Sequence, residues 1–372
     1  MPFRKPPPKK TGRAYYYRMR TPEKRFALLA RLAAILALVV VAVLIVAFGT
    51  AILLRPAHES EPGGTTTASA QLPGVEPATV SDAAPGETRD CAACPPLTMV
   101  PGGTYVMGTG APTASDGVDP GIIAASESPA HGVTLRRFAL QRTEVTRGQF
   151  AVFVKETGHQ SAGCKVFDGG AWVLDRGKNW RDPGFFQDDE HPVVCVSAAD
   201  AKAYLKWLSE KSGVRFRLPS ESEWEYAARA GVHGAYAWGK DATAACVQAN
   251  VADASLLARQ QGRDISLFFA CDGGFPFTAP VGKHTANAFG LADMIGNVRE
   301  ITADCWNPDY DGAPTNGAAR ADGNCNAVAA RGAGWADPPP NTRIARRVRT
   351  GIDERRSDQG FRIARDDAGL TP

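Results

Sequence analysis

An uncharged run of 23 residues, Leu32 to Leu54, constrains the fold of this chain more than any other feature of its sequence. As an α-helix the run would be roughly 34 Å long, which is enough to cross the hydrocarbon core of a bilayer. The alternatives are a buried helix and a cleavable signal peptide. A signal peptide usually has an apolar part of about 7 to 15 residues that ends at small residues, whereas this run ends in Leu53, Leu54 and Arg55. The sequence therefore predicts one uncleaved membrane-spanning helix over residues 32–54.

The charges beside this run predict its orientation. Residues 1–31 contain ten Lys or Arg and a single acid, Glu23, so their net charge is +9. A basic segment next to a membrane helix stays in the cytoplasm. We therefore expect a cytoplasmic tail over residues 1–31, a single pass through an inner membrane, and a periplasmic remainder. Because the whole chain carries +3, the remainder carries −6, which argues against a nucleic-acid partner.

All eight cysteines follow the membrane segment, as expected for a chain that forms disulfides in an oxidising compartment. Eight cysteines allow 105 pairings. Closeness in sequence favours four consecutive pairs, namely Cys91–Cys94, Cys164–Cys195, Cys246–Cys271 and Cys305–Cys325. For the first pair the alternative is a redox or zinc site. No second CxxC motif and no thioredoxin-like strand pattern accompany it, which favours a structural disulfide.

The remaining chain divides into a linker and one folded domain. Residues 55–90 are rich in Pro, Gly, Ala, Ser and Thr and contain no aromatic residue, so they cannot build a core. We expect a flexible linker there, a folded domain over residues 91–368, and a short tail over residues 369–372.

Local end signals predict three helices, over residues 146–158, 197–213 and 220–231. Thr146 and Ser220 each have Gln or Glu three residues later, which is the spacing of a capping box, and glycines mark the ends. Short β-like segments alternate with glycine and proline turns, at residues 99–109, 277–282, 328–335 and 360–365. Together these elements predict an α+β domain with much irregular chain.

Nine segments, taken in order, resemble the formylglycine-generating enzyme family, whose members are also called sulfatase-modifying factors. They include "MVPGGTYVMG" (99–108), "RLPSESEWEYAARAG" (217–231), "ANAFGLADMIGNVREI" (286–301) and "RGAGWADPP" through "QGFRIAR" (331–365). The resemblance covers roughly residues 95–366. It implies a C-type-lectin-like fold of small sheets, a few helices and long loops.

The resemblance also identifies where copper chemistry would be. Family oxidases convert a substrate cysteine to formylglycine with two cysteines that hold copper, and thiolates are the soft ligands that cuprous ion needs. The matching positions here are Asp337 and Thr342, so copper is not expected. An iron-dependent branch of the fold uses a histidine-rich HxxxHxE helix. The six histidines of this chain do not group in that way (His58, His131, His159, His191, His233 and His284).

The resemblance further implies a ligand groove along residues 331–351 without its thiols. Its candidate lining residues are Trp335, Asp337, Arg343 and Arg346. The arginines of this stretch either form a basic rim that recognises an anionic ligand or an acidic peptide, or pair with acids nearby in the sequence such as Asp353, Glu354 and Asp358. Asp337 is also a candidate general acid or base.

The family carries calcium, and two ligand sets are implied here. The first takes the side chains of Asp293 and Glu300 with the backbone carbonyls of Gly296 and Val298. The second takes Asn250, the Val251 carbonyl, Asp272 and the Phe275 carbonyl. In the second set the aspartate is expected at position 273, which is glycine, and Asp272 lies one residue earlier.

Arg299 and Ile301 replace two aromatic residues of the family's usual "GNVWEW" segment. Together with the missing thiols, this favours a non-oxidase role: an anchored periplasmic domain that binds a protein, peptide or small ligand as an accessory or maturation factor in the cell envelope. The alternative is a formylglycine-generating-type oxidoreductase that modifies a cysteine or another group on a target protein or ligand.

Overall fold

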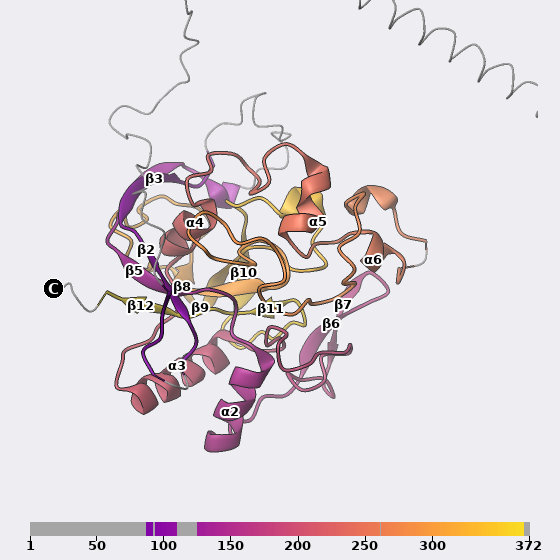
Figure 1. Ribbon diagram of the computed structural model, residues 1–372, viewed down its shortest axis with the longest axis horizontal. Coiled ribbons are helices and arrows are strands. Elements are labelled where there is room, and N and C mark those ends of the chain that lie inside the picture. The colour runs from indigo at the N-terminus through magenta and orange to yellow at the C-terminus, as the bar shows by residue number, and fades with distance from the viewer. Residues whose placement is uncertain (1–86, 92–93, 110–124, 261, 368–372) are drawn as a thin grey trace, which may run out of the picture. The chain divides into compact units, whose positions relative to one another are not determined.

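The computed structural model describes residues 87–91, 94–109, 125–260 and 262–367 (Figure 1). The chain separates into two units, residues 1–69 and 70–372, and every described residue lies in the second. The predicted tail, the membrane run and most of the linker lie outside the described residues. Across the described part of the chain, no helix is both long enough and apolar enough to span a membrane.

A four-stranded sheet brings the two ends of the domain together. Its strand order is β1 (Glu87–Thr88), β2 (Leu97–Val100), β5 (Phe138–Gln141) and β12 (Ala364–Asp366). All neighbours are antiparallel. The domain therefore begins before Cys91, where the sequence had placed its start. Backbone pairing of β1 with β2 needs no large apolar side chain, so composition gave no sign of it.

The second four-stranded sheet has the order β10 (Arg347–Gly351), β9 (Asn324–Arg331), β8 (Arg299–Trp306) and β11 (Gln359–Gly360). β11 is parallel to β8, and the other neighbours are antiparallel. Two separate hairpins complete the strands: β3 (Gly103–Met107) with β4 (His131–Leu135), and β6 (Cys164–Asp168) with β7 (Ala171–Asp175). This second sheet carries Arg299 at its end and so positions the candidate site.

Three main helices confirm the predicted end signals. They are α2 (Arg147–Thr157), α3 (Ala198–Ser212) and α4 (Glu221–Arg229), each with a complete capping box. α2 and α3 stop at glycines in the left-handed region, whereas α4 stops at Ala230, one residue before the expected Gly231. Two short helices, α5 (Ala245–Gln248) and α6 (Ala254–Leu257), were not predicted. The shorter 3₁₀ turns are Ala125–Glu127, Ala242–Ala244, Ile265–Leu267 and Pro339–Asn341.

Residues 277–282 form no strand, contrary to the prediction. The side chain of Asn297 takes the place of a strand partner there, accepting a bond from the Ala279 amide at 2.8 Å and donating to the Ala279 carbonyl at 3.3 Å. One polar side chain thus satisfies the backbone that a neighbouring strand would otherwise satisfy.

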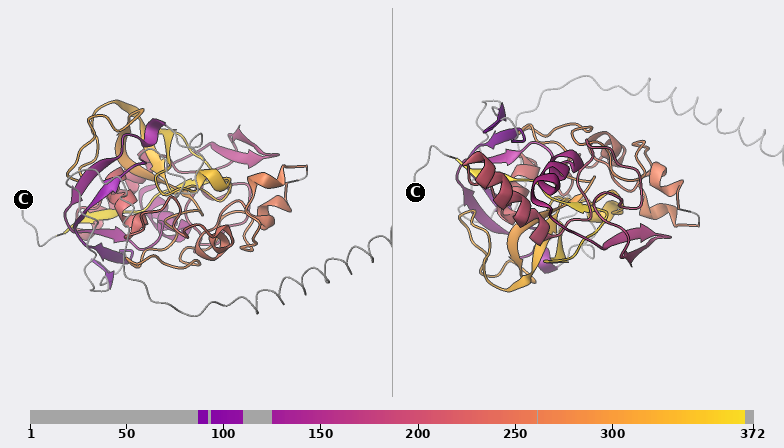
Figure 2. Two further views of the ribbon diagram at one scale, coloured as in Figure 1. Left: turned by 90° about the horizontal axis from the view of Figure 1, so that it is seen from above. Right: turned by 90° about the horizontal axis from the view of Figure 1, so that it is seen from below.

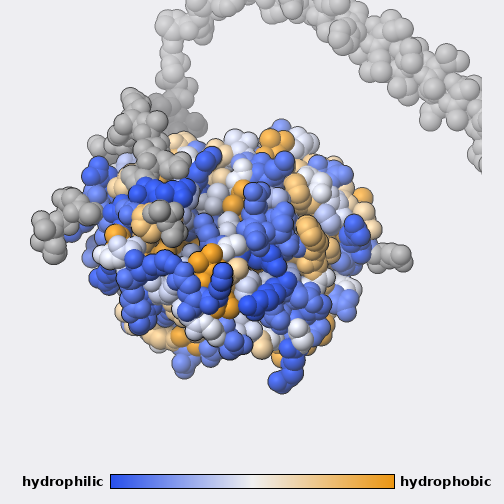
Figure 3. All heavy atoms as spheres, turned by 60° about the horizontal axis from the view of Figure 1, so that its bottom comes forward, coloured by the Kyte–Doolittle hydropathy of each residue, from blue (hydrophilic) through white to orange (hydrophobic). Residues whose placement is uncertain are grey.

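Apolar side chains gather in two main cores. One contains Trp224 of α4 and Leu140 of the first sheet, and the other contains Phe150 of α2 and Tyr204 of α3. Helices α2 and α3 lie on one side of the domain, and the β6–β7 hairpin projects at one end (Figure 2). On the face turned forward in Figure 3, hydrophilic residues cover most of the surface, and hydrophobic residues form small separate groups.

The four predicted disulfides are all present, Cys91–Cys94, Cys164–Cys195, Cys246–Cys271 and Cys305–Cys325. All eight cysteines of the sequence lie in described residues, and these bonds use every one. No thiol is therefore left to act as a metal ligand or a nucleophile. Each disulfide that closes a long loop restricts the unfolded chain, typically by about 2–4 kcal/mol.

Candidate functional site

Trp335 is the packing anchor of the region that corresponds to the family's groove. Its side chain is 1% exposed, and its indole N–H donates to the Ser357 carbonyl at 3.0 Å. Four aromatic rings surround it, with centroids 5.1 to 6.1 Å away: Phe167, Trp172, Phe185 and Phe277. Trp335 therefore stabilises the loop that carries Asp337 and is not an open ligand platform.

Asp337 lies in a bidentate ion pair with Arg299. The guanidinium Nε is 3.0 Å from Oδ2, and Nη2 is 2.9 Å from Oδ1 and 2.8 Å from Oδ2. The Gly334 amide also donates to Oδ2 at 2.8 Å. Both side chains are buried. Every oxygen of this carboxylate is engaged, so the structure does not favour Asp337 as a general acid or base.

Arg299 is shared between two carboxylates. Its Nη2 also lies 3.1 Å from Oδ2 of Asp358, which in turn pairs with Arg356. Burial alone would lower the pKa of the Arg299 guanidinium, but the charges of Asp337 and Asp358 and the hydrogen bonds to Asp337 raise it above its ordinary value. The Arg299 guanidinium therefore stays positively charged. Two departures from the family pattern, Arg299 for an aromatic and Asp337 for a cysteine, contact each other directly.

The other residues of the predicted groove also form internal contacts. Thr342 is buried, and its hydroxyl donates to the Pro339 carbonyl at 2.8 Å. Arg343 pairs with Glu127 through both terminal nitrogens. Arg343 thus forms an ion pair, as expected, but its partner is Glu127 and not an acid nearby in the sequence. Glu127 lies far from Arg343 along the chain, so no local pattern indicated this pairing.

Arg346 differs from its neighbours. It forms no ion pair within the described residues, its Nη1 donates to the Arg347 carbonyl at 3.4 Å, and its Nε is buried without a hydrogen-bond partner. Burial lowers the pKa of its guanidinium, and the charges of Glu127 and Asp337 offset this in part. Of the four groove candidates, Arg346 alone keeps an unsatisfied polar group.

The first calcium set is not assembled as the resemblance implied. Glu300 faces Arg362, with Oε2 2.6 Å from Nε and Oε1 2.5 Å from Nη2, and it accepts from the Trp224 indole at 2.8 Å. Asp293 accepts from the Gly282 amide at 2.5 Å. Arg362 thus neutralises the carboxylate of Glu300, so the set Asp293, Gly296, Val298 and Glu300 does not fit a calcium ion.

The second calcium set is rearranged around Asp253, which the sequence reasoning missed. The Asp253 Oδ2 accepts from the Gly273 amide at 2.5 Å and lies 3.1 Å from where a β-carbon of residue 273 would be. Asp272 is exposed and bonds to Ser255 and to the Gly274 amide instead. The carboxylate of Asp253 therefore occupies the place of the aspartate expected at position 273.

Asn250, another member of the second calcium set, has a side-chain oxygen that fits a cation ligand. It is buried, its Nδ2 donates to the Phe277 carbonyl at 2.6 Å, and its Oδ1 has no hydrogen-bond partner. A buried oxygen without a donor fits a cation ligand. Nowhere in the described ranges do three His, Cys, Asp or Glu side chains group closely enough to hold a metal. A cation here would therefore depend on amide and carbonyl oxygens and one carboxylate.

Residues 83–367 match the sequence profile of one family, described as the sulfatase-modifying factor enzyme 1-like domain. The chain belongs to this family of formylglycine-generating-enzyme-like proteins, as the resemblance predicted. Formylglycine-generating enzyme from Streptomyces coelicolor is 34% identical over 317 residues, which cover 73% of this chain and 89% of that protein. Inactive C-alpha-formylglycine-generating enzyme 2 from Mus musculus is 30% identical over 305 residues, which cover 73% and 85%.

Solved structures agree with this assignment. PvdO from Pseudomonas aeruginosa has a TM-score of 0.63 and 34% identity, covering 77% of this chain and 100% of its own. Treponema denticola variable protein 1 has a TM-score of 0.50 at 19% identity and shows the shared fold alone.

Proposed function

We propose that this protein is a non-oxidase member of its family, which binds a protein, peptide or small ligand as an accessory or maturation factor in the cell envelope. The observation that carries the proposal is the buried ion pair between Arg299 and Asp337. It fills a position where family oxidases hold copper with a thiolate, and charged nitrogen and carboxylate are poor replacements for soft sulfur ligands. A relative of similar identity that is named inactive supports the same conclusion.

The proposed location is the periplasmic side of an inner membrane, with one N-terminal helix as anchor. Three features support it: the uncharged run over residues 32–54, the basic segment before it, and four disulfides that form readily only in an oxidising compartment.

Calcium is the proposed cofactor, held by the rearranged second set. Asn250 Oδ1, the Val251 and Phe275 carbonyls and Asp253 would supply hard oxygen ligands. The carboxylate of Asp253 replaces the Asp272 of the sequence-based set. When bound, calcium would link the loop before α6 to the loop at residues 273–275.

Copper binding tests the non-oxidase proposal. The full-length protein in detergent is titrated with cuprous ion against a chromogenic competitor and then incubated with a sulfatase-type cysteine peptide, whose mass reports aldehyde formation. Formylglycine-generating enzyme from Streptomyces coelicolor is the positive control. We expect no stoichiometric copper binding and no aldehyde. One tightly bound copper per chain, or conversion of the peptide, would support the oxidoreductase alternative instead.

A further inference from the structure

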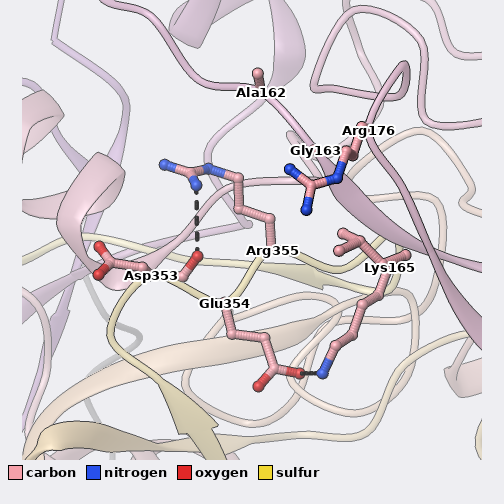
Figure 4. Close-up of a pocket in the computed structure, with 8 residues that line it drawn as sticks. Ala162, Gly163, Lys165, Arg176, Asp353, Glu354 and Arg355 are labelled. Carbon is pink, nitrogen blue, oxygen red and sulfur yellow. Dashed lines mark hydrogen bonds and ion pairs between the residues drawn. The ribbon is translucent and has the colours of Figure 1, made fainter.

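A cleft of about 350 Å³ opens between the β6–β7 hairpin and the turn that precedes β11 (Figure 4). Three basic side chains line it, together with two acids and one aliphatic side chain: Lys165, Arg176, Arg355, Asp353, Glu354 and Leu174. None of these residues belongs to the Trp335–Asp337 region.

The walls of this cleft are fixed by covalent and backbone bonds. The Cys164–Cys195 disulfide ties the start of β6 to the loop before α3. The Lys165 amide donates to the Arg355 carbonyl at 2.9 Å, and the Lys165 carbonyl accepts from the Ser357 amide at 3.0 Å. The Cys195 amide donates to the Arg356 carbonyl at 2.9 Å. A ligand would therefore meet a preformed site, which reduces the entropy lost on binding.

The charges in the cleft are unevenly paired. Lys165 pairs with Glu354 at 2.7 Å. Arg355 bonds to the buried Asp200 through Nε at 2.7 Å and Nη2 at 3.1 Å, and its Nη1 makes only a 3.4 Å contact with the Asp353 carbonyl. The side chain of Arg176 makes no hydrogen bond or ion pair with any described residue, and it lines the same cleft as Arg355 (Figure 4).

We propose that this cleft binds the carboxylate of a small organic acid or of a peptide C-terminus. Arg176 and Nη1 of Arg355, whose one contact is the long one to the Asp353 carbonyl, would donate to the carboxylate oxygens. Leu174, which is 56% exposed, would pack against the aliphatic part of the ligand. The proposal rests on the binding role proposed above and gives that role a place and a ligand chemistry.

The lining charges favour a monoanion. Lys165 is paired with Glu354 and Arg355 with Asp200, which leaves Arg176 as the lining cation without an acidic partner among the described residues, and a single carboxylate would neutralise it. A phosphate dianion would approach the carboxylates of Asp353 and Glu354 with an extra negative charge and would be disfavoured.

Calorimetric titration of the full-length protein tests this inference. The probes are N-acetyl-leucine, its uncharged amide and inorganic phosphate. We expect N-acetyl-leucine to bind, more weakly at high salt, and the amide and phosphate to bind at least tenfold more weakly. Arg176→Gln should weaken binding of N-acetyl-leucine by roughly tenfold, the usual effect of removing one charged hydrogen bond, and Arg176→Lys by less. Equal binding of acid and amide, tighter binding of phosphate, or unchanged binding by Arg176→Gln would each overturn the proposal.

Arg136→Gln is the matched control, because Arg136 is exposed between β4 and β5, at the other end of the domain from the β6–β7 hairpin (Figures 1 and 2). It should bind N-acetyl-leucine as the wild type does. The peptide Ala-Ala-Leu, with and without C-terminal amidation, distinguishes the two sources: tighter binding of the free-acid peptide than of N-acetyl-leucine indicates a peptide C-terminus. Absence of carboxylate binding overturns the cleft proposal alone, whereas copper binding or aldehyde formation overturns the proposed function.

Discussion

Arg299 and Asp337 interact across 38 residues of sequence, and both side chains are buried. A buried ion pair usually adds little to stability compared with apolar side chains of the same size, because both charges lose their hydration. Removing one partner is different, since it leaves the other charge buried and uncompensated. The measurable property of the pair is therefore the difference in unfolding free energy between removing one partner and replacing both.

Arg299→Met is expected to lower the free energy of unfolding by about 3–5 kcal/mol, because Asp337 would keep only the Gly334 amide as a donor. The double variant Arg299→Met with Asp337→Leu should recover most of this loss. Urea denaturation followed by circular dichroism measures both. If the double variant were no more stable than Arg299→Met, the loss of stability would not come from leaving the Asp337 carboxylate buried without its cation.

Asp304 gives a pH-dependent prediction. Burial, together with the charge of Glu221, raises the pKa of Asp304 to about 7. A carboxyl whose pKa is higher in the folded than in the unfolded state binds more protons when folded, so its contribution to stability is lost as pH rises from about 4 to about 7. We therefore expect the melting temperature to fall between pH 5 and pH 8.

Asp304→Asn should flatten this dependence. The variant also lowers the melting temperature at every pH, because the carboxylate accepts from the amides of Glu221 and Arg320 and an amide side chain cannot accept from both as well. The diagnostic measurement is thus the change of melting temperature with pH, compared between the variant and the wild type. Glu144 and Asp253, whose pKa values burial also raises, leave a residual slope. A slope unchanged from wild type would show that Asp304 does not titrate in this range.

At the element scale, the helices were predictable and the sheets were not. α2 and α4 are specified by a side chain at the N-cap and another three residues later, so all their signals lie within a short window. The sheets depend on pairings between distant segments, such as β2 with β5 and β5 with β12. Residues 277–282 show the difference, since their apolar pattern resembled a strand while a distant Asn297 decided their conformation.

Ser220→Ala tests the cap of α4. The Ser220 hydroxyl accepts from the Glu223 amide at 3.1 Å and donates to the Gly317 carbonyl at 2.8 Å. Its removal should lower the free energy of unfolding by about 1 kcal/mol or slightly more. Ser220→Thr keeps the hydroxyl and serves as the control. If both variants lost the same stability in denaturant titrations, packing at position 220 and not the cap would be responsible.

For the whole molecule, loops are held by disulfides, by buried charges and by close backbone approaches. Gly296 has a φ of +82°, and a β-carbon there would lie 2.4 Å from the Asn250 carbonyl oxygen, so only glycine lets these two loops meet. The disulfide pairing followed from closeness in sequence. The partners Arg343–Glu127 and Arg299–Asp337, and the use of Asp253 in place of Asp272, depend on three-dimensional proximity that no local pattern carries.

Calcium should stabilise the whole domain if the rearranged set binds it. At a concentration about 100 times the dissociation constant, binding adds about 2.7 kcal/mol to the unfolding free energy, which for a domain of this size raises the melting temperature by several degrees. Chelation with EDTA should reverse this. Differential scanning calorimetry with and without calcium measures the increment.

Variants at two positions locate the carboxylate ligand. Asp253→Asn should abolish the calcium increment, whatever its effect on the melting temperature of the metal-free protein, whose α6 it also caps. Asp272→Asn, a change to an exposed side chain, should preserve the increment. If Asp272→Asn abolished the stabilisation by calcium and Asp253→Asn preserved it, Asp272 would be the carboxylate ligand, as the sequence resemblance implied.

The Arg299–Asp337 pair also bears on how this chain can change over generations. Introducing cysteine at position 337 by itself would leave the Arg299 guanidinium with Asp358 as its acidic partner, and replacing Arg299 first would leave the Asp337 carboxylate without a cation. Each single substitution toward thiolate chemistry would thus pass through a less stable protein. The two positions are therefore expected to change together and not one at a time.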